Sequence, residues 1–233
     1  MTVASSLICV SVSADDSHGV LSALAPVLAL VDVVEVRLDT LIDPGLDLGW
    51  ICRIPRPVLV TNRPTWEGGR FAGNENQRIA LLCQALTAGA QYVDIELRTA
   101  PELRLQVQTL ARQQGARVIC SSHDFQGTPS SEQLRRTLAE MIASGADIGK
   151  IITTATQPAE ALRILALQQE ALTAAFPLSA FAMGAAGKIT RLATLYLGGC
   201  MSYAALSPDQ ATAPGQLTVA ELQGLIALLG PTP

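Results

Sequence analysis

Aromatic residues, charged residues and basic clusters are all scarce in this 233-residue sequence. Aromatic residues make up only 4% of the chain and charged residues 15%, while 49% of the residues are hydrophobic, so we expect a large and mainly aliphatic core. The net charge is −4 and no basic stretch is present, which argues against nucleic acid or an anionic membrane surface as a partner. A few well-placed arginines could still hold a small anionic ligand.

Cysteine pairs and histidine clusters are also lacking. The five cysteines are scattered singly, without a CxxC pair or a nearby histidine, which argues against a zinc site or a disulfide framework, so we expect no metal. The first apolar run has no basic segment before it and is too short for a signal peptide, and no apolar run is long enough to span a bilayer. We therefore expect a cytoplasmic protein.

What the sequence does contain is a regular alternation of strand and helix patterns. Short β-rich runs predict eight strands, at residues 7–12, 33–38, 57–62, 92–97, 117–122, 149–154, 178–183 and 202–206. Apolar residues at three- and four-residue spacing predict helices between several of them, at 75–89, 101–115, 130–145, 158–172 and 217–230. The connection at 44–54 predicts only a short helix.

This alternation predicts an α/β protein, a (β/α)8 TIM barrel that occupies residues 1–233 as a single domain. The main alternative is a doubly wound open sheet. That fold is disfavoured because the glycine-rich GxGxxG turn that usually follows its first strand is missing. No low-complexity segment or linker marks a second domain.

Three of the predicted strands carry charges where a buried parallel strand should be apolar. Side-chain alternation places Glu35 and Arg37 on one face of their strand, opposite the apolar residues. Asp94 and Glu96 share a face in the same way, and Lys150 lies within the run ADIGKIITT between isoleucines. Because unpaired buried charges are costly, we expect these side chains to point into the barrel and to meet one another, water or a ligand.

The loops after the strands add reactive side chains at the end of the barrel where active sites lie. Arg63 and Glu67 follow the third strand, His123 follows the fifth, and the loop after the seventh contains Arg191. Burial on an apolar strand disfavours an ammonium group, so Lys150 is expected to supply a free amine that can attack a carbonyl carbon and form a Schiff base. His123 could then move protons at the neighbouring carbon.

These motifs together resemble the type I 3-dehydroquinate dehydratases, the Schiff-base class of that enzyme. The resemblance covers almost the whole chain and rests on the motifs ICVSV, EVRLD, TNRPTWEGG, VDIEL, SSHDFQGTP, ADIGKI, AMGAAGKITRLA and TAPGQLTVAEL. It implies a homodimeric hydro-lyase of the shikimate pathway that needs no cofactor. Such an enzyme converts 3-dehydroquinate to 3-dehydroshikimate by syn elimination of water. Because this reaction serves both the biosynthesis of chorismate and aromatic amino acids and the breakdown of quinate, the sequence leaves both routes open.

The resemblance also implies catalytic roles for three residues. Lys150 would form an iminium with the C3 ketone of the substrate. His123 would remove a proton from C2 and then protonate the departing C1 hydroxyl. Glu67 would orient this histidine.

Substrate binding is implied for a wider group of residues. Arg191 matches the arginine that holds the substrate carboxylate, for which a planar guanidinium is suited. The TAPGQ segment matches a lid over the site. Asp94 and Glu96 are expected behind the residues that contact substrate. The full group implied in binding is Glu35, Arg37, Arg63, Arg191, Thr212, Ala213, Gln216, Ser11 and Met183.

Two positions depart from the family pattern. Thr212 replaces the usual serine of the lid, and Tyr203 replaces a phenylalanine that is common near the end of the eighth strand. We expect any effect of these two changes to fall on substrate affinity and not on the chemistry of Lys150 or His123. Two other interpretations use the same residues: a class I aldolase-type Schiff-base lyase, and a barrel that binds a ligand without turnover.

Overall fold

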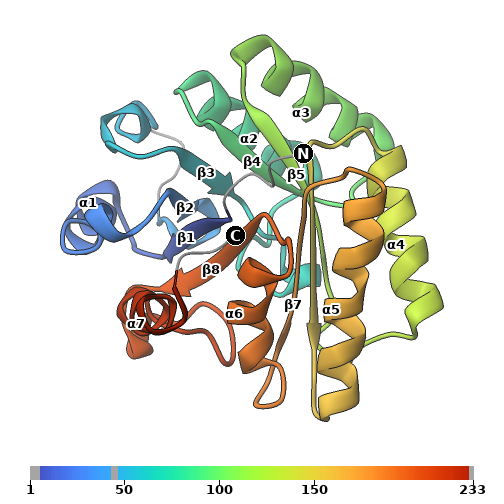
Figure 1. The fold of residues 1–233 in the computed structure, drawn as a ribbon. Coiled ribbons are helices and arrows are strands. Elements are labelled where there is room, and N and C mark those ends of the chain that lie inside the picture. The colour runs from blue at the N-terminus through green and yellow to red at the C-terminus, as the bar shows by residue number, and fades with distance from the viewer. Residues whose placement is uncertain (1–5, 43–46, 231–233) are drawn as a thin grey trace.

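The computed structural model describes residues 6–42 and 47–230. Within these two ranges, eight parallel strands form one sheet and seven α-helices surround it (Figure 1). The strands are β1 (Leu7–Val12), β2 (Val33–Arg37), β3 (Val58–Thr61), β4 (Tyr92–Glu96), β5 (Arg117–His123), β6 (Ile148–Thr154), β7 (Leu178–Met183) and β8 (Met201–Ala205). The helices are α1 (Ser17–Leu24), α2 (Glu75–Thr87), α3 (Pro101–Gln114), α4 (Ser131–Ala143), α5 (Pro158–Thr173), α6 (Lys188–Tyr196) and α7 (Val219–Leu229).

The order of the strands confirms the predicted (β/α)8 barrel. The sheet runs β7-β6-β5-β4-β3-β2-β1-β8, and each neighbouring pair is parallel. Every predicted strand is present, with bounds that differ by at most one residue at either end. Such agreement follows from composition, because strands that are buried on both faces carry long, recognisable runs of β-branched residues.

The barrel has a seam between β7 and β8. Within the described residues these two strands share no ladder of paired residues, and a backbone hydrogen bond from Cys200 N to Leu178 O (2.9 Å) links their ends. Helix α6 lies against both edges. The backbone N–H of Ala182 on β7 donates to Thr190 Oγ1 (2.8 Å), and the hydroxyl of Ser202 on β8 donates to the carbonyl oxygen of Arg191 (2.7 Å).

Two connections refine the sequence-based expectation. Between β2 and β3 the described residues form only 3-10 turns, at Leu38–Thr40 and Ile51–Arg53, while residues 43–46 of the segment expected to hold a short helix lie outside the described residues. The segment after β7 was expected to be a loop, which is wrong from Lys188 onward. This part is helix α6, which buries Leu192 and Leu195 three residues apart, and the glycines before it resemble a loop in the sequence.

The interior of the barrel is layered from apolar to charged. Along β2 and β6, the inward-facing Val33 and Ile148 belong to an apolar cluster that fills the N-terminal part of the barrel. Two residues further along the same strands come Glu35 and Lys150, both buried. The charged side chains therefore form the bottom of any cavity that opens at the C-terminal ends of the strands.

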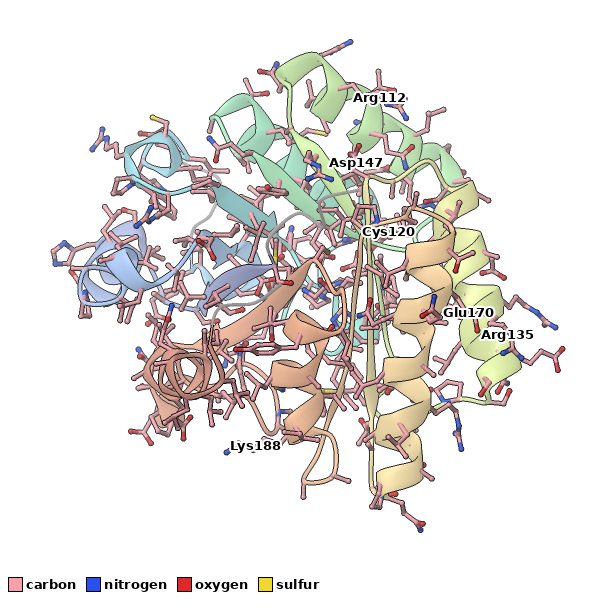
Figure 2. The ribbon with its side chains drawn as sticks, viewed as in Figure 1. Arg112, Cys120, Arg135, Asp147, Glu170 and Lys188 are labelled. Carbon is pink, nitrogen blue, oxygen red and sulfur yellow. The ribbon has the colours of Figure 1, made fainter. Side chains whose placement is uncertain are left out.

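Charged side chains at the N-terminal end of the strands and on the helices form hydrogen bonds and ion pairs outside the barrel interior (Figure 2). Asp147, the acidic residue that is nearest to Lys150 in sequence, accepts a hydrogen bond from the backbone N–H of Val118 (2.7 Å) at the start of the strands. Arg135 and Glu170 form an exposed pair between α4 and α5 (3.4 Å), of a kind that contributes at most about 1 kcal/mol. No helix among the described residues is long and apolar enough to cross a membrane.

Candidate active site

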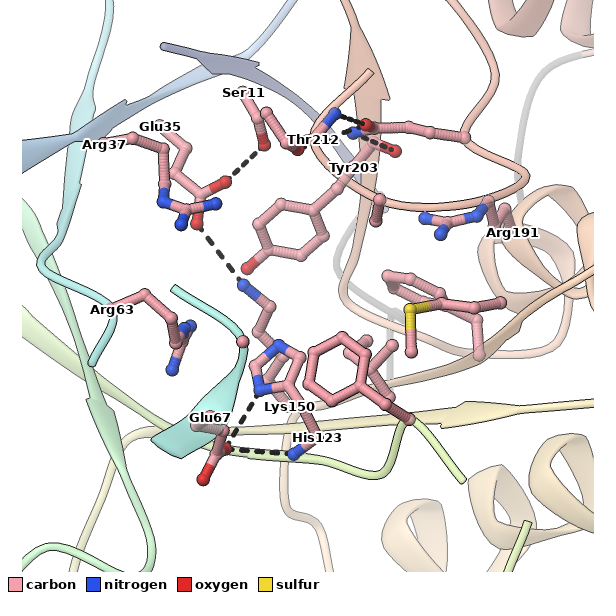
Figure 3. Close-up of a pocket in the computed structure, with 17 residues that line it drawn as sticks. Ser11, Glu35, Arg37, Arg63, Glu67, His123, Lys150, Arg191, Tyr203 and Thr212 are labelled. Carbon is pink, nitrogen blue, oxygen red and sulfur yellow. Dashed lines mark hydrogen bonds and ion pairs between the residues drawn. The ribbon is translucent and has the colours of Figure 1, made fainter. Parts of the chain in front are cut away.

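A cavity opens at the C-terminal ends of the strands, above the charged layer (Figure 3). Its empty volume, including the space that is open to solvent, is about 560 Å³. All twelve residues that the sequence analysis assigned to the site line this cavity: Lys150, His123, Glu67, Glu35, Arg37, Arg63, Arg191, Thr212, Ala213, Gln216, Ser11 and Met183. The other lining residues are Gly68, Phe125, Ile152, Phe181 and Tyr203.

Lys150 extends from β6 into the barrel and is only 5% exposed. Its Nζ atom lies 3.0 Å from Asp94 Oδ2 and 3.4 Å from Glu35 Oε1. The same atom is 3.9 Å from the centre of the Tyr203 ring, which is cation–π distance. Both carboxylates and the aromatic face stabilise a positive charge that burial by itself would disfavour. Asp94 does not itself line the cavity and contacts Lys150 from behind, as expected of a residue behind those that contact substrate.

Glu35 and Asp94 both stay ionised despite their burial. Burial raises the pKa of Glu35, but the positive charges of Lys150 and Arg37 and the hydrogen bond from Ser11 together outweigh this effect, so the pKa lies below its usual value. Glu35 also accepts a hydrogen bond from the hydroxyl of Ser11. Burial likewise raises the pKa of Asp94, and the charges of Arg63 and Lys150 lower it well below the usual range. The lysine therefore lies between two anions.

A chain of buried ion pairs extends from this pair of carboxylates toward helix α2. Arg63 pairs with Asp94 (2.8 Å) and with Glu96 (2.5 Å). The other oxygen of Glu96 pairs with Arg78 (2.5 Å), a fully buried residue of α2 that also pairs with Glu75 (2.8 Å). Sequence analysis did not identify Arg78. Breaking such a network by removing one partner leaves an uncompensated charge, which makes the network a rigid support for Arg63.

Arg37 is held by a carboxylate that the sequence analysis also missed. Its Nε and Nη2 atoms donate to the two oxygens of Asp39 at 2.9 and 2.7 Å. Asp39 further accepts hydrogen bonds from the backbone N–H groups of Arg63 (3.3 Å) and Arg70 (3.0 Å). One carboxylate thus joins the end of β2 to both ends of the segment that carries Glu67.

The segment after β3 is folded tightly enough to turn Glu67 toward the cavity. Residues Thr65–Glu67 form a 3-10 turn that ends at Gly68, whose φ of 78° favours glycine. The next residue, Gly69, packs so closely that an added Cβ atom would lie 2.0 Å from the carbonyl oxygen of Arg63. The GG of TNRPTWEGGR is therefore a structural requirement for the position of this glutamate.

His123 is the last residue of β5, and Glu67 holds it from two directions. One oxygen of Glu67 accepts the backbone N–H of His123 at 3.0 Å and lies 3.0 Å from its Nδ1 atom. Burial, with the charges of Arg63 and Lys150, lowers the pKa of His123 well below its usual value, so the imidazole is neutral at pH 7. Burial raises the pKa of Glu67 to about 7, against the opposing effect of Arg63. The ring of Phe125 stacks on the imidazole, with centroids 6.2 Å apart.

Arg191 differs from the other two arginines because it has no carboxylate partner within the described residues. It extends from α6 and is only 2% exposed. Its Nη2 atom donates to the carbonyl oxygen of Pro214 (3.2 Å), and its Nε atom finds no acceptor in the described part of the chain. Burial lowers its pKa to about 10, which keeps it cationic at neutral pH. A buried and incompletely paired guanidinium is a site for a planar anion such as a carboxylate.

The predicted lid segment lies over the cavity and is tied to its walls. Thr212 donates from both its backbone N–H (2.8 Å) and its hydroxyl (3.1 Å) to Gln216 Oε1. The amide nitrogen of Gln216 donates to the backbone carbonyl of Tyr203 (3.4 Å). Thr212 thus provides the hydroxyl that the family pattern places in this segment as a serine.

Together these groups can form and process a cationic adduct of a carbonyl compound. They provide an amine, a neutral imidazole that can accept a proton, two ionised carboxylates and an incompletely paired guanidinium. Across residues 6–42 and 47–230, no group of three or more histidine, cysteine or carboxylate side chains is arranged to hold a metal ion.

Comparisons with known proteins agree on one family. The family model described as Type I 3-dehydroquinase matches residues 8–233. The chain is 40% identical over 220 residues to 3-dehydroquinate dehydratase of Desulfotalea psychrophila, covering 94% of this chain and 96% of that protein. It is 36% identical over 209 residues to the enzyme of the same name from Methanosarcina barkeri, covering 85% of each. The crystal structure of 3-dehydroquinate dehydratase from Geobacillus kaustophilus matches with a TM-score of 0.89 at 28% identity, covering 96% of this chain and 91% of that one. The chain belongs to the type I 3-dehydroquinase family.

Proposed function

We propose that this protein dehydrates 3-dehydroquinate to 3-dehydroshikimate, a reaction of the shikimate pathway, through a Schiff base on Lys150. The observation that carries the proposal is one cavity that holds a buried amine between two carboxylates together with a neutral imidazole. The amine can form the imine, and the imidazole can move the proton that the elimination requires. No cofactor takes part in this chemistry.

The reaction begins when Lys150 loses one proton and its amine attacks the C3 ketone. Asp94 and Glu35, at 3.0 and 3.4 Å from Nζ, are the adjacent proton acceptors. Loss of water from the adduct gives an iminium, which acidifies the protons on C2. His123 takes one of these protons to give an enamine, and the enamine expels the C1 hydroxyl, which leaves as water with the proton from His123. Hydrolysis of the imine then releases 3-dehydroshikimate and the free lysine.

Charge pairing assigns the substrate carboxylate to Arg191. Arg37 is already paired with Asp39, and Arg63 with two buried carboxylates. Among the described residues, Arg191 is the arginine of the cavity that has no carboxylate partner, and its buried Nε atom has no acceptor. We infer that Arg37, Arg63 and the remaining binding residues contact the hydroxyl groups of the ring and the less charged parts of the substrate.

The ionisation of Glu67 should appear in the pH dependence of the reaction. Above pH 7 its carboxylate is charged, accepts the Nδ1 proton of His123 and leaves Nε2 free as the base. We therefore expect kcat to rise as the pH increases through about 7. In Glu67→Gln the amide oxygen can still accept both N–H groups but cannot ionise, so we expect kcat to be lower by about 10- to 100-fold and constant across this range. A Glu67→Gln profile that still rises near pH 7 would assign the ionisation to another group.

Trapping with borohydride tests the function directly. Incubation with 3-dehydroquinate and borohydride is expected to add one reduced ligand to the peptide that contains Lys150, as measured by mass spectrometry. In parallel, an enone that absorbs in the ultraviolet should form from the same substrate. Bound ligand without an adduct on this peptide would exclude the Schiff base, and release of pyruvate or an aldehyde would indicate an aldolase instead.

We further propose that residues 1–233 act as one catalytic barrel domain, in a homodimer in the cytoplasm. The match of the family model to residues 8–233 supports a single functional unit, and the resemblance to the family supports the dimer. A single cooperative transition in calorimetry, and a mass of two chains by light scattering, are the expected results. Two separate transitions or a monomeric mass would contradict the corresponding part of the proposal.

A further inference from the structure

The hydroxyl of Tyr203 is a buried polar group without a protein partner. Tyr203 is 4% exposed, and its oxygen makes no hydrogen bond to any other described residue. Among the described residues, only three other buried side-chain atoms share this property, and one of them is the Nε atom of Arg191 in the same cavity. Leaving a buried hydroxyl unpaired is costly in free energy, so its retention in a binding site points to a ligand that pairs with it.

The position of this hydroxyl is set by the strand and by the lysine. Tyr203 lies in the middle of β8, paired in register with Cys9 of β1, and its side chain is directed inward with the apolar residues of the barrel. The lysine Nζ atom lies over the ring at 3.9 Å from its centre. Figure 3 shows the hydroxyl end of the ring directed toward the amine end of Lys150 and away from Arg191. The unpaired Tyr203 hydroxyl therefore points to the part of the cavity where the Lys150 amine reacts.

We propose that the Tyr203 hydroxyl contacts the substrate and donates a hydrogen bond to the oxygen on the carbon that Lys150 attacks. This inference rests on the proposed function. Burial and nearby negative charges raise the pKa of Tyr203 well above its usual value, so the group remains a neutral O–H donor. A phenylalanine would offer the same aromatic face to the lysine but no such donor.

The hydroxyl acts on the addition step and keeps its own proton. In that step a bond forms between Nζ and the carbonyl carbon, and the π electron pair of the C=O bond moves onto oxygen. The proton that this oxygen acquires comes from the attacking amine, so the product is a neutral carbinolamine. A donor that is aimed at the oxygen stabilises the negative charge as it develops, in the way of an oxyanion hole.

The test is Tyr203→Phe, with adduct formation and thermal stability measured on the same protein. Rapid mixing with saturating 3-dehydroquinate and quenching with borohydride gives the rate at which the adduct with Lys150 forms. We expect this rate to fall by about 10-fold or more, with little change in KM. We also expect the melting temperature of the free protein to rise by about 2 to 4 °C, because an unpaired buried hydroxyl has been removed. A structural role would change stability in the opposite direction.

The control is Tyr196→Phe, which removes a tyrosine hydroxyl that already has a partner. Tyr196 Oη donates to the carbonyl oxygen of Gly230 (2.6 Å), and neither residue lines the cavity, so we expect an unchanged rate of adduct formation and a lower melting temperature. Adduct formation in Tyr203→Phe at the wild-type rate would overturn the inference while leaving the proposed function intact. A change in KM alone, or a lower melting temperature, would also overturn it. Absence of any adduct in the wild-type protein would refute the proposed function, and the inference with it.

Discussion

Replacement of Lys150 by methionine is expected to lower kcat by about 10⁴-fold or more, because the nucleophile is lost while the volume of the side chain is roughly retained. The remaining residues of the cavity would still bind 3-dehydroquinate, so an equilibrium binding measurement should detect the ligand. Borohydride should no longer attach it to the chain. A variant that keeps a kcat within 10-fold of the wild-type value would refute covalent catalysis by this lysine.

The same replacement is also expected to destabilise the protein, which has to be separated from the loss of chemistry. Without the ammonium, Asp94 and Glu35 face each other as buried anions, at a cost of about 3 to 5 kcal/mol in the free energy of unfolding. Adding Asp94→Asn should recover part of this stability without recovering activity. The matched control is Lys188→Met, since Lys188 is exposed at the start of α6 and is the only other lysine in the sequence. Its kcat should equal that of the wild-type protein.

Replacement of His123 by alanine is expected to lower kcat by about 10²- to 10⁴-fold while retaining the adduct with Lys150. The reason is geometric: the lysine is paired with Asp94 and Glu35, so groups that can accept its proton remain when the imidazole is removed. Elimination, in contrast, loses its base. Mass spectrometry after borohydride treatment measures the adduct, and ultraviolet absorbance measures the enone.

The control for this prediction is His18→Ala, which removes the other histidine of the sequence from an exposed position on α1. It should leave both the adduct and turnover unchanged. If His123→Ala lost adduct formation and turnover to the same extent, the histidine would be required for imine formation and not mainly for elimination.

The strands and the charges that face into the barrel could be predicted because burial restricts the sequence so strongly, whereas cavity residues such as Thr212, Ala213 and Gln216 were implied only by the resemblance to the family. A charge such as Glu35 or Lys150 within a run of β-branched residues is visible as an exception, and alternation then gives its direction. The partners of Lys150 could not be assigned in the same way. Asp94 lies on β4, two strands from β6, and alternation shows only that it faces inward. Which inward charges meet depends on the stagger of the strands around the barrel.

Arg78 and Asp39 were missed for different reasons. Arg78 belongs to α2, four residues before the buried Leu82, so it lies on the face that packs against the barrel, and a cation on an apolar face was the available signal. Asp39 lies two residues after Arg37 in EVRLD, and this short separation was a signal for an ion pair between them that the sequence analysis did not use. Its two further hydrogen bonds, to Arg63 and Arg70, depend on the fold of a loop that sequence patterns do not describe.

From the position of Arg191 beside the seam between β7 and β8, we infer the orientation in which an anionic substrate binds. The carboxylates of the barrel lie on β2 and β4, where Arg63 and Lys150 neutralise them. Arg191 instead comes from α6 beside the seam, where β8 and β1 lie between the seam and β2, and β7, β6 and β5 lie between the seam and β4. The C-terminal end of the barrel thus has one side where the charges are paired, at β2 and β4, and one side with excess positive charge, at Arg191. We therefore expect an anionic substrate to bind with its carboxylate toward the seam and its other end toward Lys150.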